Sequence, residues 1–527
     1  MIRSYIKIAW RSLKTNRLFS TVNILGLSIG LATTLVLFLF ILHERSFDSM
    51  YVNKAEIYRV LLNTTEDELE TWASVPSALA PELKANIPEV IEAGRLLKHD
   101  FGGVASIKAG NEVFIEKNLF WTDASIFDMF NIEIIKGSGS IVLKTPNSIL
   151  LSENTANRYF GDENPIGKII IIDNVNTLEV KGVFADFPKN SSLKFNAVAP
   201  FIMQNAAKNP SWDNASFETF LLLNSGTPDV ARIEAKIQDI VDNNVKKEEQ
   251  WYNFSIQPLE RIHLYSSTYT DSYLNTNGDI NQIRNLTALA ILILIIACIN
   301  YMNLITARSQ KRATDVGINK TLGASVKDII LRFYIETGLI TAIAMILGAV
   351  FAVLALPVFN DIAGIELNIS SLFTVKIIVF LLAIWLVTSL VSGSYPALYL
   401  SRFSPKEVLK PSTNKGGLAS IVRKGLVVAQ FSASVILIIG VLVIHKQLEY
   451  IQNKNLGYNP EHVIAISTAG IRGGEANNAL VNAFKKLPNV SVVGRSQGYP
   501  GLGVSGRSIY RSDTEETMGI ATNNSEH

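Results

Sequence analysis

Five long stretches without a charged side chain constrain the fold of this 527-residue chain more than any other feature. They are residues 21–42, 286–304, 338–356, 377–400 and 425–444. A helix needs about 20 mostly apolar residues to cross the hydrocarbon core of a bilayer. Charged residues make up only 18% of the chain, against about a quarter in soluble proteins. The sequence therefore predicts a membrane protein with an α-helical transmembrane bundle of five spans.

Lysine and arginine are concentrated in alternate segments between these stretches. Residues 1–20, 305–336 and 401–424 are rich in both, whereas the connection 357–375 contains neither. Because short cytoplasmic loops carry the excess of positive charge, the N-terminus is predicted to be cytoplasmic and residues 43–285 to lie outside the cytoplasm. The first stretch is too long for the apolar part of a signal peptide, and no small-x-small cleavage site follows it. We therefore interpret it as an uncleaved anchor.

The segment between the first two spans, residues 43–285, is too long for a loop and alternates strand and helix patterns. The expected strands are 57–62, 168–172 and 177–184, and the expected helices are 76–87, 152–160 and 228–243. Ser152 is the expected N-cap of its helix, and a turn at Asp173 joins the last two strands. The pattern predicts a large α+β domain with its own core, of a size that allows a division in two.

The N-terminal residues 1–20 have the pattern of an amphipathic helix. Its apolar face consists of Ile2, Ile6, Ala9 and Leu13. The basic residues around that face are Arg3, Lys7 and Arg11. Such a helix lies on a membrane surface, here the inner leaflet. In the span that follows, Gly26 and Gly30 form a small-x-x-x-small face that lets another helix approach closely, which fits helix packing or pairing of permeases.

The sequence contains no recognisable catalytic or metal-binding pattern. The stretch from Gly161 to Lys168 has five residues between its glycines, and Ile169 stands where a phosphate-binding loop needs Ser or Thr. The six histidines lack ligand spacing, and the single cysteine, Cys298, lies in an apolar stretch. A net charge of +2 does not indicate nucleic acid binding. We expect no catalytic residue, no metal and no directly bound cofactor.

The spans themselves contain no Asp, Glu, Lys, Arg or His, which argues against an ion-coupled transporter. Energy is therefore expected to enter elsewhere, and residues 305–336 offer a place. A short helix is expected from Ser309, a break at Leu322-Gly323-Ala324, and then an amphipathic re-entry into the third span. Two interpretations are open: a solvated, positively charged loop, or a docking helix for a cytoplasmic motor.

This segment resembles the coupling region of the FtsX-like permease family. The matching positions are Arg312, Asp315, Val316, Gly317, Lys320, Gly323 and Ala324. Asp315 and Val316 replace the commoner Glu and Ile, and Asn319 stands where a basic residue is frequent.

The domain between the first two spans is similar to the MacB-like periplasmic core domain of the same family. The motifs are Phe47-Asp48, Asn53, Ile57-Tyr58-Arg59-Val60, Pro88-Glu89-Val90, Gly94-Arg95-Leu96, Phe127-Asp128-Met129-Phe130, Lys136-Gly137, Pro146-Asn147-Ser148, Ala156 with Tyr159-Phe160-Gly161-Asp162, Gly167-Lys168, Gly182-Val183-Phe184, Asp186, Pro188 and Asn190-Ser191. The resemblance covers essentially the whole chain and points to the macrolide-exporter and lipoprotein-release group, in the long two-repeat form common in Bacteroidetes.

The resemblance implies a non-catalytic permease subunit of an ABC transporter in the bacterial inner membrane, with an FtsX-like permease domain over residues 286–400. ATP and magnesium would bind to a separate cytoplasmic ATPase subunit. Other implied partners are membrane lipid, a second permease in a homodimer or pseudo-dimer, and a periplasmic adaptor, with no nucleic acid. The residues implied in ATPase coupling are Arg312, Asp315, Gly317, Lys320 and Gly323.

Three functions remain open at this point. The first is export or extraction of peptides, antibiotics or lipoproteins, and the second is mechanotransmission to a periplasmic hydrolase. The third is a membrane-anchored sensor, which should carry a kinase, a cyclase or a methyl-accepting helix, and none is recognisable. The first two share every feature of the sequence.

The fifth stretch, residues 425–444, resembles the opening of a second copy of the same unit. Like the first stretch, it follows basic residues, here in the cytoplasmic loop 401–424, and precedes an Asn-rich segment and an apolar strand pattern. Residues 445–527 are therefore expected to start a second outer domain that truncation leaves incomplete, and to be poorly ordered.

Overall fold

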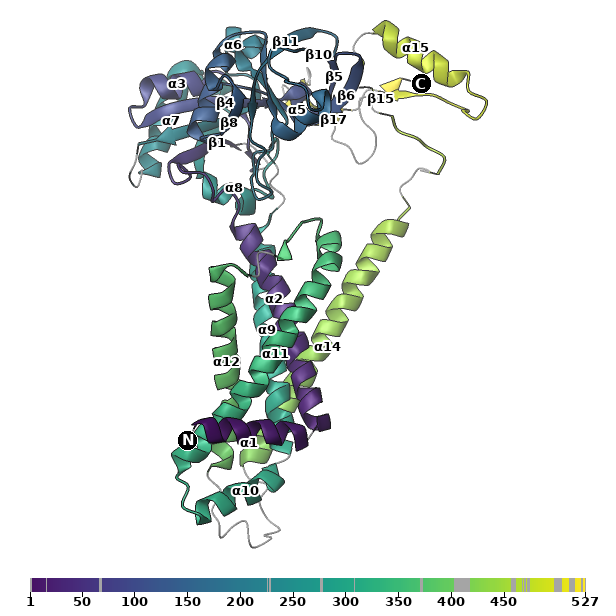
Figure 1. Cartoon of the computed structure of the whole chain (residues 1–527). Helices are drawn as coiled ribbons and strands as arrows, with labels where there is room; N and C mark the ends of the chain where they lie inside the picture. Colours follow the sequence, from purple (N-terminus) through teal and green to yellow (C-terminus); the bar gives the residue numbers. More distant parts are fainter. Residues whose placement is uncertain are drawn as a thin grey trace. The chain divides into compact units, whose positions relative to one another are not determined.

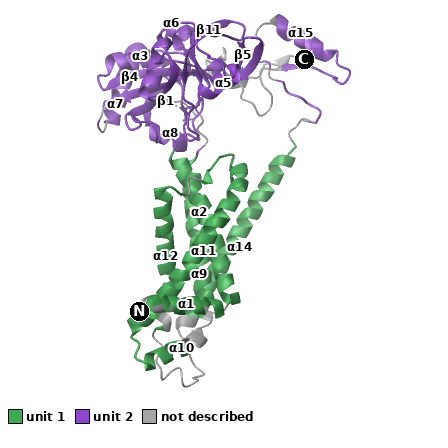
Figure 2. Ribbon diagram, in the orientation of Figure 1, with its two compact units in different colours: residues 1–46, 279–458 green, residues 47–278, 459–527 purple. Residues whose placement is uncertain are grey.

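A computed structural model gives the structure of the chain. It describes residues 2–15, 17–65, 69–224, 226, 229–274, 278–307, 309–369, 373–401, 418–455, 461–466, 468, 471, 474–496, 505–510, 517–522 and 525–526. The chain divides into two compact units (Figure 2). The helical unit comprises Met1–Ser46 and Asp279–Tyr458, and the sheet unit comprises Phe47–Gly278 and Asn459–His527.

Long apolar helices and shorter polar ones build the helical unit (Figure 1). In chain order the described helices are α1 (Ile2–Thr15), α2 (Arg17–Arg45), α9 (Ile280–Ala307), α10 (Ser309–Thr321), α11 (Val326–Ala363), α12 (Val375–Leu400) and α14 (Leu418–Asn453). Among the described residues, five helices are long and apolar enough to cross a membrane, and each contains one of the five uncharged stretches. The predicted transmembrane bundle is confirmed.

Helix α2 is central to this bundle because α9 and α11 both pack against it. Leu27 and Leu31 of α2 share a buried cluster with Tyr301 of α9 and with Ile340 and Ala344 of α11. Burying each large apolar side chain contributes about 1.5–3 kcal/mol in water, and in lipid the same contacts contribute through close packing. The bundle therefore has a specific core in addition to its lipid-facing surface.

The sheet unit is built on one 14-stranded mixed sheet with the order β14-β1-β13-β4-β7-β12-β9-β11-β10-β5-β6. These strands are β1 (Ile57–Thr64), β4 (Val90–Lys98), β5 (Ala105–Ala109), β6 (Glu112–Glu116), β7 (Leu119–Thr122), β9 (Ser148–Ser152), β10 (Ile169–Ile172), β11 (Asn176–Phe184), β12 (Ala197–Pro200), β13 (Ala215–Leu223) and β14 (Tyr252–Pro258). Three short strands lie off this path: β2 (Thr71–Trp72), β3 (Val75–Pro76) and β8 (Ile134–Gly137).

Helices and 3-10 turns cover the sheet. The helices are α3 (Leu79–Asn86), α4 (Ala124–Met129), α5 (Glu153–Phe160), α6 (Asn205–Lys208), α7 (Val230–Asn244) and α8 (Leu259–Tyr265), and the turns are η1 (His99–Gly102), η2 (Ser140–Lys144), η3 (Phe201–Met203) and η4 (Lys247–Glu249). One buried cluster joins Leu79 and Leu83 of α3 to Ile233 and Ile237 of α7 over strands β1, β13 and β14. Another lies over β9–β12 beside α5. The domain has separate apolar clusters, but a continuous sheet joins them.

Most local predictions for this domain agree with the structure. Ser152 caps α5, since its side chain accepts a hydrogen bond from the Thr155 backbone N–H at 3.3 Å. Asp173 and Asn174 adopt φ angles of 51° and 57° in the turn between β10 and β11. The helix expected from residue 76 starts later, at Leu79, because Pro76 belongs to β3 and pairs with β13.

In the C-terminal part, one helix contains the predicted fifth span and extends beyond it. Helix α14 continues to Asn453, so the first residues of the segment 445–527 extend the fifth apolar helix. Beyond it the structure describes α15 (Gly474–Lys485) and two short antiparallel pairs, β15 (Arg495–Ser496) with β18 (Ser525–Glu526) and β16 (Ser505–Tyr510) with β17 (Thr517–Thr522). The loop residues 402–417, which form most of the predicted segment 401–424, lie outside the described residues.

Candidate functional site

Helix α10, which contains the coupling positions expected from the sequence, is attached to two of the membrane-crossing helices. Val316 is 4% exposed and packs in a cluster with Ile329 and Phe333 of α11 and with Ala397 of α12. The neighbouring Gly317 is also buried. This apolar contact joins a polar helix to the start of one span and the end of another. We call α10, its turn and the adjoining ends of α11 and α12 the coupling corner.

Lys320 and Gly323 have structural roles in this corner. The Lys320 Nζ donates a 2.6 Å hydrogen bond to the carbonyl oxygen of Ser401, directly after α12. Gly323 has a φ of +93°, a conformation that favours glycine, and it reverses the chain after α10. Ser325 and Asp328 then form a reciprocal capping box that starts α11. The orientation of α10 relative to α11 is therefore fixed on both sides of the turn.

The opposite face of the coupling corner is exposed and partly apolar. Asp315 is exposed on α10, Ile318 is 54% exposed, and Leu322 in the turn is 81% exposed. Val326, at the start of α11, is 48% exposed. The sequence analysis named Leu322 only as part of a break and did not single out Ile318 or Val326. Their signal was the helical spacing, since Ile318 and Leu322 lie four residues apart and away from the face of Val316.

One expected coupling residue cannot be placed in this way. Arg312 lies in helix α10, but its side chain is outside the described part of the structure. Of the remaining expected residues, the structure therefore puts Gly317 and Lys320 on the inner face, Gly323 in the turn and Asp315 on the outer face.

The glycine face of α2 packs against α9 of the same chain. A Cβ added at Gly30 would lie 2.7 Å from the Cβ of Ala297, and one added at Gly26 would lie 3.3 Å from the Asn300 side chain. The close approach that these glycines allow is therefore made within one chain, between α2 and α9.

We call Phe47–Gly278, the larger part of the sheet unit, the main sheet domain. Its first segment follows α2 in the chain, and its last segment precedes α9. Both segments are anchored in the domain, and we call them together the root. Phe47 stacks on the His263 ring with centroids 3.4 Å apart, and Asp48 accepts hydrogen bonds from the Ser192 N–H at 2.8 Å and its hydroxyl at 2.6 Å. Burial raises the pKa of Asp48, and the Ser192 hydrogen bonds oppose this. At the other end, a Cβ on Gly278 would lie 2.6 Å from the His263 Nε2.

A buried ion pair anchors the chain segment that precedes α9. Arg59 and Glu218 both have side chains that are 0% exposed, with a closest N–O distance of 3.5 Å. Glu218 accepts hydrogen bonds from the Ser272 hydroxyl at 3.1 Å and from the backbone N–H groups of Tyr273 and Leu274. The chain between α8 and α9 is thus bound to the centre of the sheet through residues 272–274.

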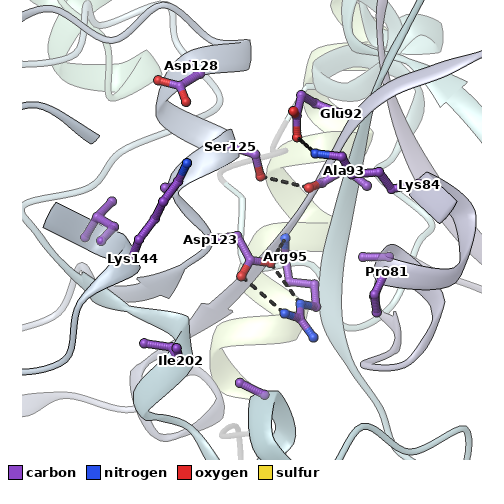
Figure 3. Close-up of a pocket in the computed structure, with 14 residues that line it drawn as sticks. Pro81, Lys84, Glu92, Ala93, Arg95, Asp123, Ser125, Asp128, Lys144 and Ile202 are labelled. Atoms are coloured by element: carbon purple, nitrogen blue, oxygen red, sulfur yellow. Dashed lines mark hydrogen bonds and ion pairs between the residues drawn. The ribbon is translucent and has the colours of Figure 1, made fainter. Parts of the chain in front are cut away.

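A cavity of about 480 Å³ opens between α3, β4 and α4 (Figure 3). Arg95 points at Asp123 across its wall and forms a two-pronged ion pair, with distances of 2.8 and 3.2 Å (Figure 3). Lys84 pairs with Glu92 in the same lining. These four charges are neutralised within the domain, so Arg95 of the Gly94-Arg95-Leu96 motif joins β4 to α4 instead of presenting a free charge.

Within the described residues, no three His, Cys, Asp or Glu side chains gather in a way that could hold a metal ion. Lys168, in the loop that superficially resembles a phosphate-binding loop, pairs with Glu163. The backbone N–H of Gly167 donates to the Val180 carbonyl at 2.8 Å, which ties this loop to β11.

Comparison with known proteins identifies both parts of the chain. The MacB-like periplasmic core domain family matches residues 20–240, and the FtsX-like permease C-terminal family matches residues 287–405. The chain is 21% identical over 420 residues to the uncharacterized ABC transporter permease YvrN of Bacillus subtilis, covering 77% of this chain and 99% of that protein.

Two export proteins are also similar. The pyoverdine export ATP-binding/permease protein PvdT of Pseudomonas syringae is 23% identical over 419 residues, which cover 77% of this chain and 59% of that protein. The macrolide export ATP-binding/permease protein MacB of Aggregatibacter actinomycetemcomitans is 25% identical over 254 residues, which cover 45% of this chain and 35% of that protein. The crystal structure of the periplasmic region of MacB from Actinobacillus actinomycetemcomitans gives a TM-score of 0.30 at 15% identity, covering 39% of this chain and 90% of that one. The chain thus spans less than two thirds of the length of either curated export protein.

The family matches cover the sheet domain and the helices that carry the coupling corner, in the order in which this chain presents them. The chain belongs to the ABC transporter permeases of the MacB and FtsX type.

Proposed function

We propose that this chain is the permease subunit of an ABC exporter in the bacterial inner membrane, with its N-terminus in the cytoplasm and the main sheet domain in the periplasm. The basic segments 1–20 and 305–336 support this orientation, since positive charge collects on the cytoplasmic side. In this proposal the permease works with a separate ATPase subunit. Export relatives such as PvdT are named ATP-binding/permease proteins, so ATP binding and a permease act together in them.

The observation that carries the proposal is the two-sided coupling corner. Its inner face joins α10 to α11 and α12, and its outer face presents Ile318, Leu322 and Val326 to solvent. Exposed apolar side chains that form a contiguous patch rimmed by polar residues are typical of a protein-binding surface, and we propose that these three form such a patch. When a docked ATPase closes, a short helix fixed to two spans moves those spans with it.

The root of the main sheet domain supports the second half of the mechanism. Asp48 and Phe47 hold the segment after α2, and Glu218 holds the segment before α9. With both connections bound to one sheet, a displacement of the connecting segments is expected to move the domain as a body. We propose that this movement expels a substrate on the periplasmic side.

The substrate class follows only from the names of relatives, which export pyoverdine and macrolides. We propose an amphiphilic molecule of peptide, antibiotic or lipoprotein type. A second permease and a periplasmic adaptor complete the assembly in this proposal, and the second permease does not use the Gly26–Gly30 face, because α9 fills it.

The test is co-expression of the full chain with the ABC ATPase from the same genome, followed by co-purification and ATPase assay. Ile318→Asp with Leu322→Asp removes two apolar contacts that are each worth about 1.5–3 kcal/mol when buried, so association should weaken at least about tenfold. The matched control is Val113→Asp with Ile115→Asp on β6, at side chains that are 61% and 57% exposed. The control pair should bind the ATPase like the wild type.

Lys320→Glu separates docking from transmission. It breaks the bond to the Ser401 carbonyl on the inner face, so ATPase binding should persist while the dependence of hydrolysis on the permease is lost. If the Ile318/Leu322 variant binds the ATPase normally, the assignment of the docking face is wrong. Recovery of a cell-wall hydrolase as the periplasmic partner, with no transported substrate, would replace export by mechanotransmission.

A further inference from the structure

Helix α1 carries a stripe of basic side chains that the coupling mechanism does not use. Its four exposed basic residues follow one another at intervals of four, four and three, which places them on one helix face. They are Arg3, Lys7, Arg11 and Lys14. The helix contains no acidic residue, and across the described part of the chain no carboxylate pairs with any of the four. We call these four residues the basic stripe.

Exposed apolar side chains lie along one edge of this stripe. Ile6 is 45% exposed and Trp10 is 49% exposed, although both have large apolar side chains. The next face is the one that packs: Ala9 is 4% exposed, and Leu13 joins the cluster of Leu27 in the bundle core. Helix α1 therefore has a packed face, an exposed apolar edge and a basic stripe, in that order around its axis.

The position of α1 in the chain decides what can meet these surfaces. It ends at Thr15, and the membrane-crossing helix α2 begins at Arg17. A helix that is separated from a span by one residue cannot leave the bilayer surface. Because α1 also packs against α11, its packed face is fixed, and the basic stripe must face away from the bundle core.

We propose that the basic stripe of α1 binds the headgroups of anionic phospholipids. Tryptophan and isoleucine at the edge enter the boundary between headgroups and acyl chains, and the cations beside them meet phosphate oxygens. Arginine can bind a phosphate with two parallel hydrogen bonds, whereas lysine acts as a point charge. Each basic residue near an anionic leaflet strengthens binding about fivefold. Since α1 packs on α11, bound lipid also stabilises the helical unit.

The test uses the purified full chain in a neutral detergent, titrated with dioleoylphosphatidylglycerol or dioleoylphosphatidylcholine. Retained lipids are counted by native mass spectrometry, and the midpoint of thermal unfolding is followed in parallel. The variant replaces the whole basic stripe by Gln. The matched control makes the same charge change at four exposed lysines of the sheet unit: Lys108, Lys136, Lys144 and Lys208. Glycerol phosphate without acyl chains is a further arm.

The wild type and the control should retain phosphatidylglycerol in preference to phosphatidylcholine, and higher salt should weaken the preference. The stripe variant should bind phosphatidylglycerol at least about 100-fold more weakly and lose its thermal shift. If the stripe variant does not fold, Lys7→Gln with Arg11→Gln should weaken phosphatidylglycerol binding about 25-fold.

Equal binding of both lipids, unchanged binding by the variant, or an equal loss in the control overturns the proposal. So does an equal thermal shift with glycerol phosphate, which would indicate a soluble anion site. A stripe variant that keeps the lipid but loses the ATPase would assign the stripe to the ATPase instead.

Discussion

Replacing Arg59 by Met should destabilise the main sheet domain far more than replacing an exposed cation. Arg59 is fully buried beside Glu218, and it donates 2.8 Å hydrogen bonds to Gln257 and Ser266. Methionine fills a similar space without charge, so the variant leaves the Glu218 carboxyl buried without its cation. Removing one partner of a buried ion pair costs about 3–5 kcal/mol.

The expected shift can be set against a control in the same domain. For a part of 150–250 residues, 1 kcal/mol corresponds to about 2–4 °C in the midpoint of thermal unfolding, so Arg59→Met should lower it by about 6–20 °C. Lys54 and Glu260 form an ion pair at 3.0 Å whose side chains are 37% and 54% exposed. Such pairs contribute about 0–1 kcal/mol, so Lys54→Met should shift the midpoint by at most about 4 °C.

The assay is thermal unfolding of the full chain in detergent, followed by tryptophan fluorescence. The signal comes mainly from the sheet unit, which contains Trp72, Trp121, Trp212 and Trp251. The double variant Arg59→Met with Glu218→Gln removes both charges, so its loss should be smaller than the sum of the two single losses by about 1–3 kcal/mol.

The pH dependence gives a second check. Burial raises the pKa of Glu218 above the ordinary value of 4.5, and Arg59 opposes that rise. Without Arg59 the pKa rises further, and a raised acid pKa means that stability is highest below the unfolded value and is lost as pH rises through the folded value. Arg59→Met should therefore be less harmful near pH 5 than near pH 8. Additive single losses, or a shift no larger than that of Lys54→Met, would refute the argument.

Two further predictions concern packing and capping. Gly30→Leu should disrupt the α2–α9 contact, because even a Cβ would lie 2.7 Å from that of Ala297, whereas Gly440→Leu on α14, with nothing within 4 Å, should be tolerated; the yield of monodisperse protein in detergent distinguishes them. Ser152→Ala removes the cap on the Thr155 N–H and should cost about 1 kcal/mol in thermal unfolding; a loss above about 3 kcal/mol would mean that Ser152 does more than cap α5.

The sequence predicted elements whose cause is local. The uncharged stretches, the Ser152 cap and the Asp173 turn each depend on residues within a few positions of one another. The order of the strands was not predictable in this way. Ile57 pairs with Leu222 and Tyr58 with Pro258, and nothing in either local pattern names the partner. The continuous sheet thus came only from the structure.

The coupling corner shows the same limit at the level of single side chains. The family resemblance implied that Asp315 and Lys320 both act in coupling. In the structure Asp315 is exposed, whereas Lys320 binds the Ser401 carbonyl. Which face of α10 points inward depends on α12, whose end lies far along the chain. Conversely, Ile318 and Leu322 stand out only because Val316 occupies the inner face, which the local sequence does not specify.

The motifs that identified the family serve mainly to join distant segments. Asp48 binds Ser192, Asn53 donates to the Met129 carbonyl, and Gly137 of β8 lies opposite Gly182 of β11. At Gly182 a Cβ would lie 2.4 Å from the Ser138 carbonyl oxygen, so close backbone contact accounts for that motif without any ligand. Because these residues are occupied by contacts within the domain, they specify its fold and its root. In the proposed exporter, selectivity for a substrate would then reside in residues outside the motifs, because function depends on the site and not on the shared architecture.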